Sequence, residues 1–492
     1  MTTARTRRRL ARTACVLAVV TAVGAAMPAA EARPPKGDTA RVSEGPKGEG
    51  LDRESLALGL SGDGRLALFS SSASNLLPGG AGAGGDVYVR DLRNGHLQRV
   101  SVTDDGASLD AGTGEAAISG DGRYVVFATA ATNLLPGLPK HAGDVYLRDL
   151  WTGRTELVTA ADGTSGTGDD QSIRSAHDPA VSWDGRYVTY SSDRTDLAPG
   201  VRRGKSNVFV TDRWTHTTKV VSTGADGGPA DNSSYSPTIS ADGSRIAFNS
   251  RAGNLLPSAE TPPAAEAATA DTATADSPEE PDAARTTART TGRTTARSAV
   301  GGASPRLAGL RAYPDYVWDA RTGRITGASL DESGALQGGG ADGQISPSGR
   351  YVVYNLFQPG GRPGSHGRHS DVFLHELATG RVTKVSTPPP GTTDLRDSFN
   401  ATMTLDDRVF FASDADGLVP GDTNEQTDVF RYDPRTGHTD RVSLTRDGTQ
   451  STASSYFPRV DAFGTTLLFT ADDGNLVPGD DNQNADVFRR LL

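Results

Sequence analysis

Two loops near the C-terminal end of the chain carry oxygen-bearing side chains at close spacing. One reads Asp-x-Asn-x-x-x-Asp and the other Asp-Asp-Asn-x-Asn-x-Asp. Hard oxygen donors at alternate positions are what Ca²⁺ selects, although neither loop has the full EF-hand spacing. We therefore consider two interpretations, a calcium site and a solvated Asp/Asn turn. The candidate calcium ligands are Asp422, Asn424, Asp428, Asp480, Asn482 and Asp486.

A histidine motif is the nearest approach of the sequence to a transition-metal site. His366, His369 and Asp371 form the pattern His-x-x-His-x-Asp in a loop rich in glycine and arginine. Imidazole nitrogens and a carboxylate are ligands that Zn²⁺ and related metals accept. The sequence has no G-x-S-x-G, no H-E-x-x-H and no paired cysteines, so the common hydrolase and zinc-protease signatures are absent. We assign no catalytic residue.

Other aspartates recur too regularly to mark one active site. An acid opens a short apolar run in most copies of a repeat, and a second acid follows five residues later. The first set is Asp86, Asp144, Asp371, Asp428 and Asp486, and the second is Asp91, Asp149, Asp212, Glu376 and Asp433. A residue type present in nearly every copy is explained more economically as a turn or ladder device than as a catalyst.

The repeat itself shows what positions these side chains. An aromatic residue closes a short apolar run seven times, at intervals of 57 to 63 residues except for one of 106. These aromatic residues are Phe69, Phe127, Tyr190, Phe248, Tyr354, Phe411 and Phe469. A unit that recurs at a fixed period stacks on its own copies.

Each copy carries four strand signals. In the copy from Ala117 to Thr159, an Asp-Gly turn at residues 121–122 separates the first two apolar runs, and a Thr-Gly turn separates the last two. Asp-Gly between apolar runs is a strong hairpin signal, because glycine supplies the positive φ of the turn. Four antiparallel strands repeated around an axis describe a β-propeller blade. We predict an all-β fold, a single seven-bladed β-propeller within residues 39–492.

The copies define the predicted blade boundaries. The seventh copy reaches Leu492 without a fourth strand, and residues 39–43 carry the matching Arg-Val-Ser sequence. We expect this N-terminal strand to complete the last blade and to close the ring, which removes an exposed edge. The blades are predicted near 57–101, 115–159, 178–222, 236–329, 341–386, 401–443, and 459–492 plus 39–43.

Two segments fall outside the repeats. Residues 1–32 have a basic start, an apolar run and a small-residue cleavage site, as a signal peptide does, and the only cysteine, Cys15, lies within them. Residues 258–311 are rich in Ala, Thr, Pro and Gly, a composition that favours a disordered low-complexity insertion in blade 4. We expect a secreted chain with no membrane span after cleavage.

The repeat resembles those of TolB-like, WD-repeat-like β-propeller proteins of the exported bacterial type. The resemblance is carried by the units S-x-D-G-x-x-x-x-F and D-V-Y/F-x-x-D-x-x-T-G, and it covers nearly all of residues 39–492 outside the insertion. It implies a propeller. It does not imply a ligand, because such propellers serve as scaffolds, binding proteins and enzyme-associated domains.

The net charge and the loop lengths limit the kinds of partner and the binding face that we expect. Removing five arginines and one glutamate with the signal from 50 basic and 60 acidic side chains leaves a net charge of −14, which argues against a nucleic-acid partner. Long loops, including a recurrent Asn-Leu-Leu-Pro-Gly element, share one face. We predict a monomeric, non-catalytic scaffold that binds a protein or cell-envelope polymer through this face.

Two alternatives stay open, a propeller-type glycan lyase or hydrolase and a calcium-stabilised structural module. An enzyme would need copy-specific acids or histidines at the axis end of the first strand in each blade. The residues there are core-like, which favours binding. They are Leu60-Ser61, Ile118-Ser119, Val181-Ser182 and Ile239-Ser240.

Overall fold

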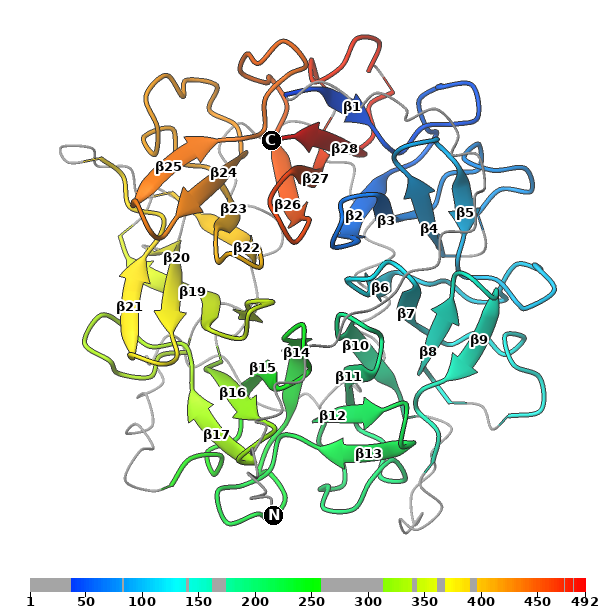
Figure 1. Cartoon of the computed structure of the whole chain (residues 1–492), viewed down its shortest axis with the longest axis vertical. Helices are drawn as coiled ribbons and strands as arrows, with labels where there is room; N and C mark the ends of the chain where they lie inside the picture. The colour runs from blue at the N-terminus through cyan, green and yellow to red at the C-terminus, as the bar shows by residue number, and fades with distance from the viewer. Residues whose placement is uncertain are drawn as a thin grey trace, which may run out of the picture. The chain divides into compact units, whose positions relative to one another are not determined.

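Figure 1 shows the computed structural model of the chain, whose described strands all lie within Pro35–Leu492. The described residues are 37–81, 84–138, 141–161, 174–257, 313–338, 343–360, 368–389, 396–472, 474–480 and 482–492. The predicted signal peptide, 1–32, and the predicted insertion, 258–311, lie outside these residues. Within the described part of the chain, no helix has the length and apolarity needed to cross a membrane.

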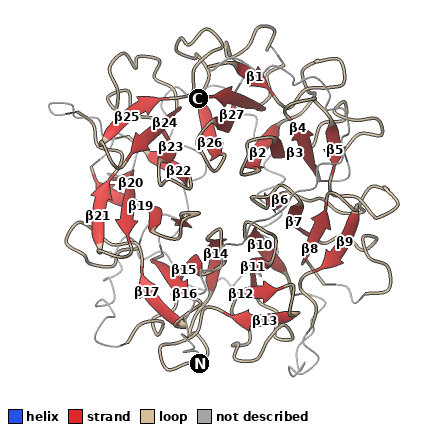
Figure 2. Ribbon diagram, in the orientation of Figure 1, coloured by secondary structure: helices blue, strands red, loops and turns tan. Residues whose placement is uncertain are grey.

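The described residues form seven antiparallel four-stranded sheets around a common axis, which confirms the predicted seven-bladed propeller (Figures 1 and 2). The first four blades, each written from the axis outward, have the following strands. Blade 1 is β2 (Ser55–Leu60), β3 (Leu66–Ser71), β4 (Asp86–Asp91) and β5 (Leu97–Arg99); blade 2 is β6 (Glu115–Ile118), β7 (Tyr124–Thr129), β8 (Asp144–Asp149) and β9 (Arg154–Leu157); blade 3 is β10 (Ala176–Val181), β11 (Tyr187–Ser192), β12 (Asn207–Asp212) and β13 (Thr217–Val220); blade 4 is β14 (Ser234–Ile239), β15 (Arg245–Ser250), β16 (Asp315–Asp319) and β17 (Arg324–Gly327).

The last three blades follow the same order. Blade 5 is β18 (Gln344–Ile345), β19 (Tyr351–Pro359), β20 (Arg368–Glu376) and β21 (Arg381–Lys384); blade 6 is β22 (Ser398–Met403), β23 (Val409–Ser413), β24 (Asp428–Asp433) and β25 (His438–Arg441); blade 7 is β26 (Ser455–Val460), β27 (Thr466–Ala471), β28 (Asp486–Leu491) and β1 (Thr39–Arg41). The outermost strand of blade 7 therefore comes from the other end of the chain. Thr39 pairs with Arg490, and Arg41 pairs with Phe488.

The Ser-x-Asp-Gly sequence makes the turn between the first two strands of a blade. In blade 2, Ser119 Oγ donates to Asp121 Oδ1 at 2.5 Å and accepts the N–H of Tyr124 at 2.9 Å. Gly122 has a φ of 71°, a conformation that glycine adopts without steric cost. The tight turn sets the register of the second strand against the first.

The aromatic landmarks pack into the centre of each blade. Each one stacks on an aromatic residue of the neighbouring third strand, with ring centroids 5.6 to 6.1 Å apart. Such offset aromatic pairs stabilise a core beyond the area they bury. The pairs are Phe69–Tyr88, Phe127–Tyr146, Tyr190–Phe209, Phe248–Tyr316, Tyr354–Phe373, Phe411–Phe430 and Phe469–Phe488, and the rings of the last pair are tilted by 31°.

The recurrent Asn-Leu-Leu-Pro-Gly element holds the loop between the second and third strands. Its first leucine is buried, as Leu76 and Leu476 illustrate. Its asparagine accepts a backbone N–H from the segment that enters the blade, at 3.1 Å from Asp52 to Asn75 and at 2.8 Å from Thr452 to Asn475. The element is therefore explained by the scaffold, and it presents the residues that follow it.

Candidate functional site

All six predicted calcium ligands lie on one edge of the blades, which we call the long-loop face. At this edge the second strand of each blade ends and the third begins, so it carries the loops 72–85 and 472–485 and their equivalents. The opposite edge, the short-turn face, carries the Asp-Gly turns and the turns between the third and fourth strands.

In blade 6 the predicted ligands surround an arginine. Arg441 Nη1 lies 2.7 Å from Asp422 Oδ1 and 3.2 Å from Asp428 Oδ2. Asn424 Nδ2 donates to the same Asp428 oxygen at 2.9 Å. Ser443 Oγ donates to Asp428 Oδ1 at 2.5 Å. The side chains of both aspartates are buried, so their charges depend on these partners.

Blade 7 repeats this arrangement with residues from the other end of the chain. Arg41 Nη1 lies 2.9 Å from Asp480 Oδ1 and 3.6 Å from Asp486 Oδ2. Asn482 Nδ2 and Ser43 Oγ donate to the two oxygens of Asp486, at 2.8 and 2.6 Å. β1 thus supplies the arginine, and the segment directly after it supplies the serine, so the site exists only where the two ends of the chain meet.

Blade 1 shows the ordinary form of the repeat, from which the acidic clusters of blades 6 and 7 differ. Arg99 pairs with Asp86 there, at 3.5 Å. The residue at the position of Asp422 is Gly80, whose carbonyl oxygen accepts a hydrogen bond from Arg99. Blade 1 therefore places one acid beside one arginine, whereas blades 6 and 7 place two acids beside one.

The second acid affects the titration of these clusters. Burial, and then the nearby Asp428 carboxylate, raise the pKa of Asp422 to about 6. Burial likewise raises the pKa of Asp428 and of Asp486. A buried cluster with an excess carboxylate gains stability from a proton or another cation. Either would serve the same electrostatic purpose.

The geometry bears on the calcium prediction without testing it. In both clusters a guanidinium already lies between the two carboxylates, where a cation would be expected. Within the described residues, no group of three or more His, Cys, Asp or Glu side chains is arranged to hold a metal ion. Calcium binding stays a prediction, and titration calorimetry with millimolar Ca²⁺ checks it. A heat of binding that is smaller in Asp422→Asn or Asp480→Asn would support these residues as calcium ligands. The absence of any heat in the wild-type chain would contradict the calcium prediction.

The recurrent acids of the third strand are held by a hydroxyl that lies two residues beyond the end of the fourth strand, an arrangement that fits a ladder device. In five blades a hydroxyl donates to the buried carboxylate at 2.5 to 2.8 Å and accepts the N–H of the following residue at 2.7 to 3.2 Å. We call this arrangement the hydroxyl–carboxylate clasp. Its pairs are Ser101–Asp86, Thr159–Asp144, Ser386–Asp371, Ser443–Asp428 and Ser43–Asp486.

The histidine motif is split between described and undescribed residues. His366 lies outside the described residues. His369 Nε2 is 3.1 Å from Asp371 Oδ2, and Lys384 Nζ lies 2.6 Å from the same oxygen. Lys384 thus supplies an ammonium group beside this pair.

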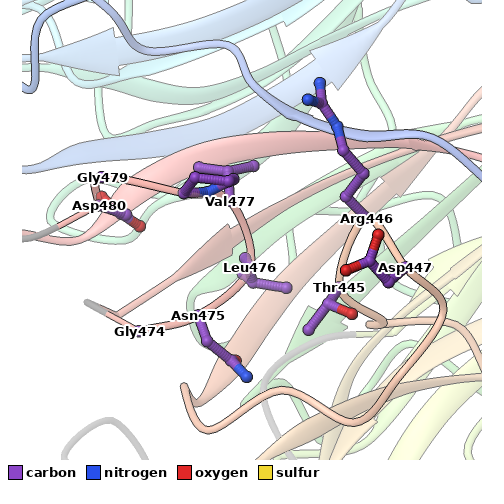
Figure 3. A pocket seen from close by; sticks show the side chains of 10 residues that line it. Thr445, Arg446, Asp447, Gly474, Asn475, Leu476, Val477, Gly479 and Asp480 are labelled. Carbon is purple, nitrogen blue, oxygen red and sulfur yellow. The ribbon is translucent and has the colours of Figure 1, made fainter.

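A pocket of about 390 Å³ opens on the long-loop face where blades 6 and 7 meet. Figure 3 shows Thr445, Arg446 and Asp447 opposite Asn475 and Leu476. Asp480, one of the predicted ligands, also lines it. The walls combine one basic, two acidic, one amide and several apolar side chains, and Arg446 Nε is bonded to Asp38 at 3.1 Å.

One cluster near the axis was not expected from the sequence. It joins Glu115, His177 and Asp178 with Tyr235 and Ser236 of the next blade. Glu115 Oε2 accepts the N–H of Asp178 at 2.9 Å, and Asp178 Oδ2 accepts the N–H of Ser236 at 3.3 Å. The His177 and Tyr235 rings stack with centroids 6.5 Å apart. Copy-specific acids therefore do occur on the first strands, with Glu115 three residues before Ile118 and Asp178 three residues before Val181.

Proline was the signal that could have revealed this cluster. Asp178 and Ser236 each precede a proline and have positive φ angles of 52° and 49°. Each lies at a break in the strand register, between His177 and Ala180 or between Tyr235 and Thr238. Proline inside a strand marks a bulge or an edge, and a bulge turns the local backbone toward a new direction.

No family model and no curated protein matches this sequence. The chain is similar in structure to an oligogalacturonate lyase in complex with manganese, with 12% identity, a TM-score of 0.48 and 93% of each chain covered. It is also similar to the β-propeller domain of the Trilobed protease from Pyrococcus furiosus, with 11% identity, a TM-score of 0.44 and 86% and 91% of the two chains covered. A putative TolB from Agrobacterium tumefaciens is similar with 12% identity, a TM-score of 0.35, and 83% of this chain and 98% of that chain covered. These similarities concern the fold alone.

Proposed function

We propose that this chain is an exported, non-catalytic propeller that binds a protein or cell-envelope polymer through its long-loop face. The observation that carries the proposal is the pocket between the loops of blades 6 and 7. Its volume of about 390 Å³ falls within the range of about 300–1,000 Å³ usual for ligand sites. Ligand sites favour such junctions because loops from two rigid elements converge there.

The lining suits a neutral or mixed-charge polar partner. Arg446 and Asp447 are exposed and of opposite charge, and Leu476 and Val477 supply apolar surface behind them. A peptide or a glycan chain offers matching hydroxyl, amide and C–H groups. A polyanion gains little from this surface, because the acids around the pocket outnumber its one arginine.

Engagement of the acids by the scaffold supports a binding role over catalysis. The recurrent third-strand carboxylates are buried and held by clasps, and Asp422 and Asp480 are paired with arginine. A general acid or base must be able to reach the proton it transfers. These acids are committed to internal partners instead.

The test compares retention of cell-envelope material by the purified chain and by pocket variants. Arg446→Ala/Asp447→Ala removes two exposed side chains of the wall and should weaken retention at least tenfold. The matched control, Arg93→Ala/Asn94→Ala, changes an exposed turn on the short-turn face of blade 1 and should leave retention unchanged. Equal loss in both variants, or in neither, would contradict the proposal.

The axial cluster makes glycan lyase or hydrolase activity a second candidate. Glu115, His177 and Asp178 are the copy-specific titratable side chains that such an enzyme would need near the axis. Incubation with oligomeric polyuronates and neutral glycans, followed by ultraviolet detection of unsaturated products and by reducing-end assay, distinguishes the two functions. Turnover by the wild-type chain that is lost in Glu115→Gln would establish enzymatic activity. We expect no turnover by the wild-type chain.

A further inference from the structure

Two tryptophans occupy the same repeat position on neighbouring blades of the short-turn face. Trp151 lies in the turn between β8 and β9, and Trp214 lies in the turn between β12 and β13 (Figure 1). Their side chains are exposed by 74% and 64%. Large exposed aromatic groups commonly mark binding surfaces. The corresponding residues of the other described blades are Arg93, Arg321, Ala378 and Arg435.

Each indole is held by an arginine that is itself fixed. The Arg123 guanidinium carbon lies 4.7 Å from the Trp151 ring, and that of Arg186 lies 4.5 Å from the Trp214 ring. Both arginines are paired at 2.7 Å with an acid of the adjacent strand, Asp149 or Asp212. The indoles therefore have a supported orientation while remaining largely open to solvent, which reduces the entropy lost on binding.

The support runs across the boundary between blades 2 and 3. The guanidinium carbon of Arg123 also lies 4.9 Å from the Tyr124 ring of blade 2, and that of Arg213, from blade 3, lies 4.6 Å from the same ring. Arg213 is in turn paired with Glu156. Arg123, Arg186 and Arg213 each have an acidic partner, so the arginines that support the indoles add no unbalanced positive charge.

We propose that Trp151 and Trp214 form a platform that binds a neutral β-linked gluco-configured polysaccharide. In such sugars the hydroxyls are equatorial and the C–H bonds are axial, so each ring presents a C–H face to the negative face of an aromatic ring. Two indoles at the same repeat position of consecutive blades suit a polymer, because a chain that reaches both gains from bivalent attachment. The site goes beyond the proposed function, since it lies on the opposite face from the pocket.

The surroundings favour a glycan over a protein. The centres of protein interfaces are apolar and depleted of charge, whereas the two indoles are separated by charged and hydroxyl side chains. Thr152 and Arg154 flank Trp151, and Thr215 and His216 flank Trp214. Such groups can hydrogen-bond to the equatorial hydroxyls at the rim of each sugar ring.

The experiment uses the full purified chain with cellohexaose and chitohexaose as probes, followed by calorimetry and tryptophan fluorescence. Each of Trp151→Ala and Trp214→Ala should weaken binding about tenfold, and the double variant should abolish measurable binding. The matched control, Arg93→Ala/Arg321→Ala, changes the same repeat position in blades 1 and 4 and should bind as the wild type does. Thermal melts confirm that all variants are folded.

Three results would overturn the proposal. The first is no binding of either probe by the wild-type chain, and the second is equal binding by the double variant. The third is stronger binding of an oligogalacturonate, which would indicate recognition of charge rather than of the C–H face. Loss of envelope retention in the pocket variant with unchanged cellohexaose binding would separate this site from the proposed function.

Discussion

The hydroxyl–carboxylate clasp explains why an acid can be repeated around the fold without forming an active site. One hydroxyl satisfies both a buried carboxylate and a backbone N–H of the third strand, as Ser443 does for Asp428 and Val429. An unsatisfied buried polar group costs more than a typical hydrogen bond contributes. The clasp therefore lets each blade bury polar groups close to its aromatic core.

Replacing Ser443 with alanine should lower the free energy of unfolding by about 1–3 kcal/mol, because it removes one partner each from Asp428 and from the Val429 N–H. Ser74→Ala is the control, since Ser74 Oγ also donates to a carboxylate, that of Asp52, but at an exposed site. Its effect should stay within about 0.5 kcal/mol. Urea unfolding measures both, and similar effects of the two substitutions would contradict the buried role of the clasp.

The raised pKa of Asp422 predicts a specific pH dependence. The folded chain should hold this proton up to about pH 6, whereas an unfolded chain releases it near pH 3.9. The folded state then binds more protons between about pH 4 and 6, so the contribution of Asp422 to stability falls as the pH rises through this range. Urea unfolding of both chains across this pH range, with a chelator present, should show a smaller fall in the free energy of unfolding for Asp422→Asn than for the wild type. Identical slopes in both chains would contradict the assignment.

At the scale of elements, β1 is the strand on which blade 7 depends. It pairs with β28, and it brings Arg41 to Asp480 and Ser43 to Asp486. Without it, β28 would present unpaired backbone groups at its outer edge, and the buried carboxylates of Asp480 and Asp486 would lose their arginine partner.

Deleting residues 33–52 should therefore lower the melting temperature sharply, as measured by circular dichroism or calorimetry. Deleting only residues 1–36 is the control, because it leaves β1 and its contacts in place. An unchanged melting temperature after the longer deletion would show that the strand does not stabilise the fold.

Much of the fold could be predicted because its signals are local. The Asp121-Gly122 turn and the consecutive apolar residues at 124–127 lie within a few residues of each other. The apolar run closed by an aromatic residue recurs in seven copies, and the Asp-Gly turn recurs in the first four. The N-terminal strand could be matched to blade 7 because Arg41-Val42-Ser43 repeats the sequence Arg99-Val100-Ser101.

The candidate site was less predictable because its partners are distant in the sequence. The spacing of Asp480, Asn482 and Asp486 suggests a cation, but the cation that the structure places there is the guanidinium of Arg41, 439 residues from Asp480. The recurrent Arg-Val-Ser sequence was the available signal. The axial contact between Glu115 and Asp178 depends on a left-handed backbone angle at a bulge, which a strand pattern does not specify.

At the scale of the whole propeller, the two faces have different roles in this account. The long-loop face varies between copies and carries the pocket at the boundary of blades 6 and 7. The short-turn face carries exposed tryptophans at one repeat position in blades 2 and 3, and exposed Leu405 and Phe463 in the first turns of blades 6 and 7. Both the pocket and the two tryptophans were identified because their residues differ from those at the same position of the other copies.

The most direct test of the account is site-specific photo-crosslinking in intact cell envelopes. A photoreactive phenylalanine replaces Asp447 at the pocket in one variant and Asn94 on the short-turn face of blade 1 in the other. We predict a discrete crosslinked product, identified by mass spectrometry or glycan analysis, from position 447 and none from position 94. Products from position 94 alone, or the same products from both positions, would contradict binding through the long-loop face.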